Sequence, residues 1–173
     1  MDTIQITGTA FLGADFVPET VDITISNGII ADISPARTKS DSLILPAFFN
    51  AHTHIGDTVA LDTRIDRPLA ELVAPPDGLK HQILRETPED RLISAMRSSM
   101  QYMRASGTTG FADFREGGRD GVSALSAAKI PGIMPLIFGR DGGELLPDAA
   151  GFGLSSAHRR DEEREAADAA RKA

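Results

Sequence analysis

Two histidines, two positions apart, are the residues of this sequence whose types and spacing could do chemistry. His52 and His54 end the stretch "LILPAFFNAHTH", residues 43–54, whose apolar run is typical of a buried strand. Because alternate residues of a strand point to the same face, both imidazoles would project together, with Thr53 turned away. Imidazole is a common ligand of Zn²⁺ and Fe²⁺, so the spacing indicates a metal site.

A second interpretation of the pair needs no metal. Both histidines can be polar residues at the end of a strand, hydrogen-bonded to neighbouring loops. A catalytic metal usually takes three or more protein ligands, so two histidines alone do not complete a site. The context favours the ligand interpretation, because the pair ends an apolar strand, follows a small β segment and precedes a long loop.

The composition limits which other chemistry the chain can contain. The 173 residues include no cysteine, so any metal must be held by His, Asp or Glu. The formal net charge of −7 argues against a nucleic-acid partner, which requires clustered Lys and Arg. The chain starts without the pattern of a secretory signal, and its longest apolar run, "LILPAFF", is too short to cross a bilayer. We therefore expect a cytoplasmic protein with no membrane partner.

The first forty residues are expected to form a small β-sheet. The segment "VDITIS" alternates apolar and polar residues, as a strand with one buried face does. Asn27-Gly28 follows it and is the preferred pair for a type I′ hairpin turn. The segments "IIADIS" and "TIQITGTAFL" are the second and third strands of the predicted sheet.

From residue 43 onward, strand-like and helix-like segments alternate. The apolar run at residues 43–50 predicts a strand buried on both faces, and residues 55–86 are expected to be an irregular loop. Strand–helix repeats of the length that follows argue for parallel βαβ units. The further predicted elements are a helix at 88–106, a strand at 108–114, a helix at 120–129, a strand at 132–139, a short strand at 151–156 and a charged helix after Ser156.

The longest predicted helix carries an apolar stripe that includes three methionines. The residues of the stripe recur at helical spacing, and they are Leu92, Ile93, Met96, Met100 and Met103. Methionine readily fills irregular gaps in protein cores. We therefore interpret the stripe as core and not as a binding surface.

Two segments carry a resemblance to a known family. "LILPAFFNAHTHIGD", residues 43–57, resembles the first barrel strand of the amidohydrolase superfamily, in which "PGFVNAHTH" is common, although Ala47 stands where glycine is usual. "ASGTTGFADF", residues 105–114, resembles the second strand of the same family. The resemblance implies an α/β fold with a small β-sandwich segment at residues 1–42. It further implies a partial TIM (β/α)8 barrel, about the first four β/α units, at residues 43–173.

The resemblance also implies an activity. Members are metal-dependent hydrolases that act on carbon–nitrogen bonds other than peptide bonds, by deamination or by hydrolysis of rings and amides. His52 and His54 would be the first two ligands of one divalent metal, Zn²⁺ or alternatively Fe²⁺, which lowers the pKa of a bound water. The family's later ligands, a histidine and an aspartate, have no counterpart in this sequence, and its catalytic acid and base cannot be assigned. "GFGLSS" lacks the lysine of binuclear members, which favours a mononuclear site of the deaminase or chlorohydrolase branch.

Three further residues are candidates for substrate binding. Asp57 follows His54 by three positions and could bind substrate, hold a ligand histidine or cap a loop. Arg115 could clamp a carboxylate or a polarised carbonyl with its planar donors, and Glu116 could be its polar partner. A salt-bridged loop is the alternative for both. Lys80, by contrast, is expected to lie in a solvated loop.

Two alternatives to a self-contained enzyme remain open at this point. In the first, the chain is a non-catalytic half-barrel that needs a C-terminal half, and it forms a homo-oligomer through exposed strand edges. In the second, it is an unrelated open α/β binding domain with structural histidines. The substrate cannot be read from the sequence, because specificity in barrel enzymes resides in loops after several strands.

Overall fold

The computed structural model describes residues 2–63, 66–154, 164 and 168. The chain divides into two compact units, Met1–Ala47 and Phe48–Ala173, which are considered separately below. None of the described helices is both long and apolar enough to span a bilayer.

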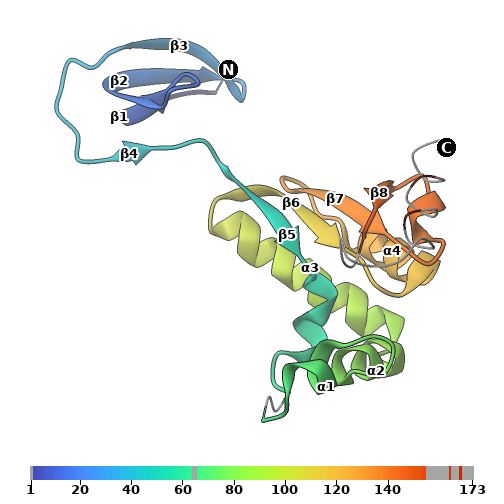
Figure 1. Ribbon diagram of the computed structural model, residues 1–173. Helices are drawn as coiled ribbons and strands as arrows, with labels where there is room; N and C mark the ends of the chain where they lie inside the picture. Colours follow the sequence, from blue (N-terminus) through green and yellow to red (C-terminus); the bar gives the residue numbers. More distant parts are fainter. Residues whose placement is uncertain (1, 64–65, 155–163, 165–167, 169–173) are drawn as a thin grey trace. The chain divides into compact units, whose positions relative to one another are not determined.

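The first unit is a four-stranded sheet with the strand order β3-β2-β1-β4 (Figure 1). Strands β1, β2 and β3 pair in antiparallel fashion, whereas β4 pairs in parallel with β1. The three strands predicted from the sequence are confirmed, and Asn27 and Gly28 have φ values of 52° and 78°, as a type I′ turn requires. The strands are β1 (Thr3–Leu12), β2 (Val17–Ser26), β3 (Ile29–Pro35) and β4 (Leu43–Ile44).

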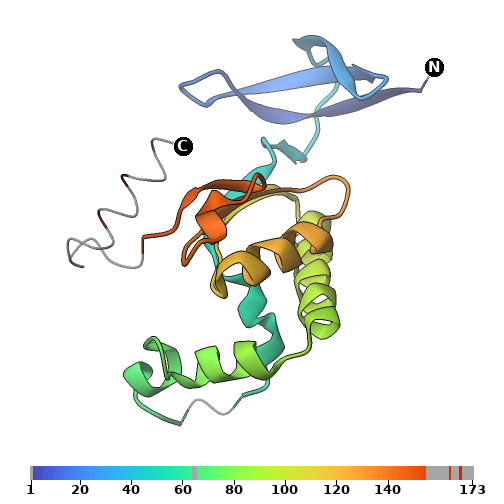
Figure 2. The same cartoon turned by 90° about the vertical axis from the view of Figure 1, so that its right-hand side faces the viewer.

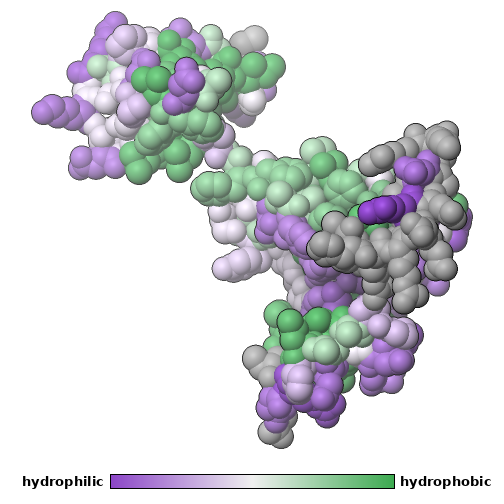
Figure 3. All heavy atoms as spheres, viewed as in Figure 1, coloured by the Kyte–Doolittle hydropathy of each residue, from purple (hydrophilic) through white to green (hydrophobic). Residues whose placement is uncertain are grey.

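This sheet buries a small apolar core. Ala10, Val21 and Ile23 are buried on one face. Other large apolar side chains of the sheet remain exposed, among them Ile29 and Ile30, and Figure 3 shows apolar side chains gathered over this unit. Within residues 2–47 the strands form one sheet, so the second layer of the predicted β-sandwich is not seen in this segment.

The strand predicted at residues 43–50 is divided in two. Strand β4 ends at Ile44, and β5 spans Phe48–Thr53. Pro46 separates them because it has no N–H to donate to a strand ladder. The expected burial on both faces is also wrong, since Phe48 is 56% exposed. In the part of the chain that the structure describes, β5 pairs only with β6, which leaves its side chains less covered.

The second unit is built on a parallel sheet whose strand order, β5-β6-β7-β8, follows the chain. Parallel neighbours need crossover connections, and helices α3 and α4 supply two of them. Both helices lie on the same face of the sheet (Figure 2). The predicted strands and helices are confirmed within a few residues: α3 (Glu89–Ala105), β6 (Thr108–Phe114), α4 (Gly118–Ala128), β7 (Met134–Gly139) and β8 (Ala149–Phe152).

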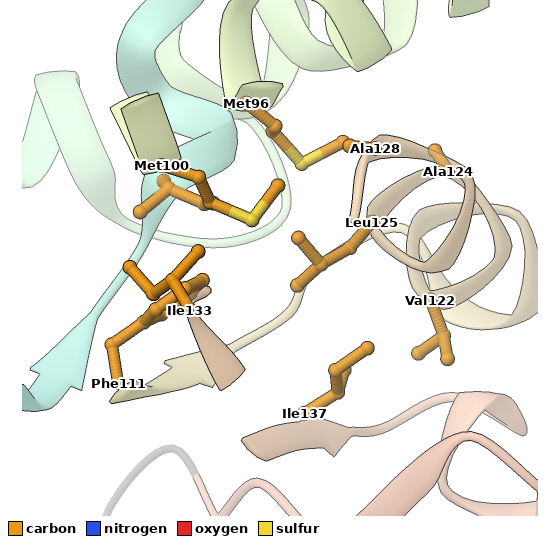
Figure 4. Packing of buried hydrophobic residues seen from close by; sticks show 10 residues of the cluster. Met96, Met100, Phe111, Val122, Ala124, Leu125, Ala128, Ile133 and Ile137 are labelled. Atoms are coloured by element: carbon orange, nitrogen blue, oxygen red, sulfur yellow. The ribbon is translucent and has the colours of Figure 1, made fainter. Parts of the chain in front are cut away.

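The core of this unit lies between the two helices and the sheet (Figure 4). Met96 and Met100 of α3 have no exposed surface and share this core with Phe111 of β6, Leu125 of α4 and Ile137 of β7. The apolar stripe predicted on the helix is therefore confirmed as core. The rest of the stripe is partly buried against the same cluster, namely Leu92, Ile93 and Met103.

The irregular loop predicted at residues 55–86 is wrong, because most of this segment is helical. It contains a 3₁₀ helix, η1 (Ile55–Ala60), and two short α-helices, α1 (Leu69–Val73) and α2 (Leu79–Glu86). Proline and glycine residues gave the segment its loop-like pattern, yet Pro68 and Gly78 are the N-caps of the two helices. Of the charged helix predicted after Ser156, only residues 164 and 168 are described, and both are helical.

Candidate active site

His52 and His54 lie at the carboxyl end of β5, where parallel α/β folds commonly assemble their sites. Their Nε2 atoms are 3.2 Å apart, so the two imidazoles converge on one point. Two nitrogen ligands, each about 2.0–2.1 Å from a tetrahedral Zn²⁺, are about 3.3 Å apart. The spacing of the pair therefore fits a shared metal ion.

An aromatic side chain supports both imidazoles. The ring centroid of Phe114, the last residue of β6, lies 4.5 Å from that of His52 and 6.1 Å from that of His54. Phe114 in turn stacks on Phe138 of β7 at 5.3 Å. The histidine pair is thus backed by an apolar wall from the neighbouring strands, which restricts the movement of the rings and shields one side from water.

Asp113 anchors the backbone on both sides of His54. Its Oδ2 accepts hydrogen bonds from Thr53 Oγ1 at 3.0 Å and from the Ile55 backbone N–H at 2.6 Å. Thr53 is therefore turned away from the histidines, as the strand pattern predicts. Burial raises the pKa of Asp113, and the nearby Arg115 guanidinium, the Ile55 N–H and the Thr53 hydroxyl only partly offset that effect.

Glu116 contacts His54 from the other side of the imidazole. Its Oε1 lies 3.0 Å from Nδ1 of His54 and 2.6 Å from Nζ of Lys80, and its Oε2 accepts a hydrogen bond from Arg115 at 2.9 Å. Burial alone would raise the pKa of Glu116, but contacts with His54, Arg115 and Lys80 outweigh it and hold the pKa well below its usual range. Glu116 is therefore an anion throughout the neutral range.

Arg115, a predicted substrate clamp, is 1% exposed and has its donors directed at the protein. Its guanidinium donates to Glu116 and, at 3.3 Å, to Oδ1 of Asp113. The backbone of η1 covers it so closely that a Cβ at Gly56 would lie 2.3 Å from two guanidinium nitrogens. This arrangement suits Arg115 to holding two carboxylates in place.

Asp57 and Lys80 extend the charged cluster to α2. Nζ of Lys80 lies 2.8 Å from Oδ2 of Asp57, and the Lys80 side chain is only 14% exposed. The prediction that Lys80 belongs to a solvated loop is therefore wrong. No signal in the sequence identifies it, because its partners Asp57 and Glu116 come from distant segments that only the fold brings together.

A cleft of about 900 Å³ borders this cluster. Pocket volumes of about 300–1,000 Å³ are typical of small-molecule sites. Glu116 and Arg115 line the cleft together with His81 and Arg85 of α2 and with Arg140, which follows β7. Of the sequence-predicted residues, Glu116 both contacts His54 and lines the cleft, and Arg115 lines the cleft as well, whereas neither His52 nor His54 is among the lining residues.

The described residues supply the histidine pair but no complete metal shell. Among residues 2–63, 66–154, 164 and 168, no group of three or more His, Asp or Glu side chains is arranged to hold a metal ion. Glu116 does not extend the pair, because it contacts Nδ1 of His54 while the two Nε2 atoms face each other. The fit to a metal therefore rests on two nitrogen ligands.

Residues 43–172 match the model of the amidohydrolase family. The chain belongs to this family. The chain is 41% identical, over 143 residues, to a "Putative aminohydrolase" of Methanothermobacter thermautotrophicus. It is 37% identical, over 125 residues, to a "Putative aminohydrolase" of Archaeoglobus fulgidus. The resemblance stated from the sequence is thereby confirmed.

The compared proteins are longer than this chain. The two matches cover 78% and 71% of the chain but only 37% and 36% of the relatives. A solved Xaa-Pro dipeptidase with methionine bound in its active site has a TM-score of 0.51 and 16% sequence identity, with 80% of this chain and 34% of that chain covered. At that identity the likeness concerns the fold alone, a mixed α/β structure with a parallel sheet.

Proposed function

We propose that this amidohydrolase hydrolyses carbon–nitrogen bonds of a small molecule, by deamination or by opening an amide or ring, with one divalent metal held in part by His52 and His54. The observation that carries the proposal is the 3.2 Å separation of the two Nε2 atoms at the carboxyl end of β5. Bound there, Zn²⁺, or alternatively Fe²⁺, would lower the pKa of a water molecule toward neutrality and so supply the attacking nucleophile.

The location of the histidine pair in the fold supports this proposal. We interpret β5 to β8 with their helices as the first four units of a TIM barrel, because the strands are parallel and neighbour one another in chain order. Barrel enzymes bind substrate at the carboxyl ends of the strands. His52, His54 and the residues that follow β6 and β7 all lie at such ends.

Residues of this chain would then bind the metal, exclude water and accept the substrate. His52 and His54 hold the metal, and Phe114 keeps water from one side of their rings. The cleft beside Glu116 and Arg140 accepts the substrate. Both relatives named above carry the word aminohydrolase in their names, which supports a C–N bond as the target. Family membership does not favour the alternative of a non-catalytic half-barrel.

Metal binding by the histidine pair provides the test. We expect the wild-type chain to bind Zn²⁺ in isothermal titration calorimetry and to retain it in elemental analysis after gel filtration. The double variant His52→Asn/His54→Asn should lose that binding. The matched control is His81→Asn, since His81 lies on α2 and contacts the carbonyl of Val73 instead of the pair. Equal Zn²⁺ binding by the double variant and the wild type would refute the proposed site.

Activity gives a second, independent measurement. Ammonia release from a panel of aminopurines, aminopyrimidines and simple amides should be detectable with the metal-loaded wild-type protein and absent with the double variant. Hydrolysis of such substrates at equal rates by both proteins would show that the histidine pair has no part in the reaction.

A further inference from the structure

Lys80 connects a wall of the cleft to the histidine pair. It belongs to α2, whose neighbouring residues His81 and Arg85 line the cleft. Its ammonium group leaves α2 and lies between two carboxylates, 2.8 Å from Asp57 and 2.6 Å from Glu116. A lysine buried to this degree is held by both contacts, because each compensates part of the cost of removing the charge from water.

Glu116 transmits this contact to His54. The oxygen that Lys80 contacts, Oε1, is the same oxygen that lies 3.0 Å from Nδ1 of His54. The other oxygen, Oε2, is fixed by Arg115. The carboxylate is therefore held at both oxygens, and at Oε1 Lys80, at 2.6 Å, is the closer of two cations, since Nη2 of Arg140 is 4.0 Å away.

A carboxylate beside one ring nitrogen of a histidine influences whether the other nitrogen carries a proton or a lone pair. It favours the tautomer with the proton on the nearer nitrogen, here Nδ1, and leaves Nε2 with a free lone pair. Such partners commonly orient metal-binding histidines, and their loss typically weakens metal affinity about 10–100-fold. In this structure, Nε2 of His54 is the atom that faces His52.

We propose that Lys80 is a positioning residue that holds Glu116 against Nδ1 of His54. Because Lys80 belongs to α2, the position of α2 at the cleft then affects the orientation of a metal-binding histidine. Where it treats His54 as a metal ligand, this inference rests on the proposed function. The contacts from Lys80 through Glu116 to His54 do not depend on it.

The first test uses no metal. Ring-nitrogen chemical shifts of His54, from long-range ¹H–¹⁵N correlation spectra at a fixed pH near 8, report its tautomer, and a His54→Gln variant assigns the signals. We expect well-separated Nδ1 and Nε2 shifts in the wild type and converging shifts in Lys80→Met. Lys80→Arg, which keeps a cation, should restore much of the separation. The matched control is Lys129→Met, because Lys129 is 40% exposed and pairs with Asp148 away from the site.

The second test measures metal affinity directly. Calorimetric titration with Zn²⁺ should give an affinity about 10–100-fold lower for Lys80→Met than for the wild type. The Lys129→Met control should retain wild-type affinity. A role of Lys80 in stability alone would lower the melting temperature without moving either the His54 shifts or the affinity of the folded protein.

The outcomes separate this inference from the proposed function. A folded Lys80→Met variant with unchanged His54 shifts would overturn the inference, even if the wild type binds Zn²⁺. A wild type that binds no Zn²⁺ would refute the proposed function, whereas the shifts would still decide the role of Lys80. Should Lys80→Met fail to fold, Lys80→Gln removes the charge that contacts Glu116 while keeping a polar side chain, and unchanged His54 shifts in that variant would equally overturn the inference.

Discussion

Asp113 and Ile55 are joined by a 2.6 Å hydrogen bond from the backbone N–H of Ile55 to Oδ2 of the carboxyl group. The bond links β6 to the first residue of η1, the position at which a helix favours a negative group. The same oxygen accepts a hydrogen bond from Thr53, so the residues before and after His54 share one anchor. The segment that carries His54 is thus anchored on both sides by a residue of the neighbouring strand.

Replacement of Asp113 by alanine should destabilise the protein. Asp113 has no exposed surface, and its loss would leave the Ile55 N–H and part of the Arg115 guanidinium without a partner. Removal of one member of a buried ion pair typically costs about 3–5 kcal/mol. Urea unfolding of wild type and Asp113→Ala measures the change. Asp148→Ala is the control, because Asp148 is exposed and should tolerate the change. Unfolding curves that coincide for wild type and Asp113→Ala would contradict the anchoring role.

The raised pKa of Asp113 predicts a specific dependence of stability on pH. Because the folded state raises this pKa, mainly through burial, it holds the proton more tightly than the unfolded state does. The contribution is fully present below the unfolded value of 3.8 and is lost as the pH rises through the folded pKa. The difference in unfolding free energy between wild type and Asp113→Asn should therefore decrease as the pH rises above about 4. A difference that grows with pH would contradict the direction of this shift.

The histidine pair could be predicted from the sequence, but most of its surroundings could not. Two histidines separated by one residue at the end of a strand share a face by local geometry alone. The contacts of Glu116 with His54 and Lys80 join three segments that are far apart in the sequence. Spacing carries no information on such contacts. Arg115 illustrates the limit, since its burial under Gly56 cannot be inferred from the charged sequence around it.

The fold shows the same division between local and non-local information. The apolar stripe of α3 and the alternation in β2 are periodic, and each predicted its element correctly. Burial of β5 was mispredicted because it depends on which strands pair beside it. The helices α1 and α2 were missed because proline and glycine mark both loops and helix starts, so the same residue types permit two interpretations.

Met100 offers a direct test of the core that the stripe predicted. Its side chain has no exposed surface and packs within the cluster between α3, α4 and the sheet. Truncation of a buried methionine to alanine leaves a cavity and typically costs about 2–5 kcal/mol. Chemical unfolding of Met100→Ala should show a loss in this range. Tyr102→Ala on the same helix is the control, since Tyr102 is 77% exposed and should change stability by much less.

At Gly121, helix propensity and packing predict opposite effects of a substitution by alanine. It lies in α4, where alanine is favoured over glycine by about 1 kcal/mol in a helix interior. A Cβ at this position, however, would lie only 1.9 Å from the backbone carbonyl oxygen of Glu116, which has little freedom to move. Overpacking of this kind typically costs about 1–3 kcal/mol, so we expect Gly121→Ala to lower the unfolding free energy despite its better propensity.

Ser123→Ala in the same helix isolates the propensity effect, because Ser123 is exposed and its replacement should leave stability unchanged or slightly increased. The clash at Gly121 should also displace Glu116, so the ring-nitrogen shifts of His54 should move in Gly121→Ala and remain constant in Ser123→Ala. Greater stability in Gly121→Ala than in the wild type would show that the Glu116 backbone yields easily. The carboxylate would then be held by its side-chain contacts alone, those with Lys80, Arg115, His54 and Arg140.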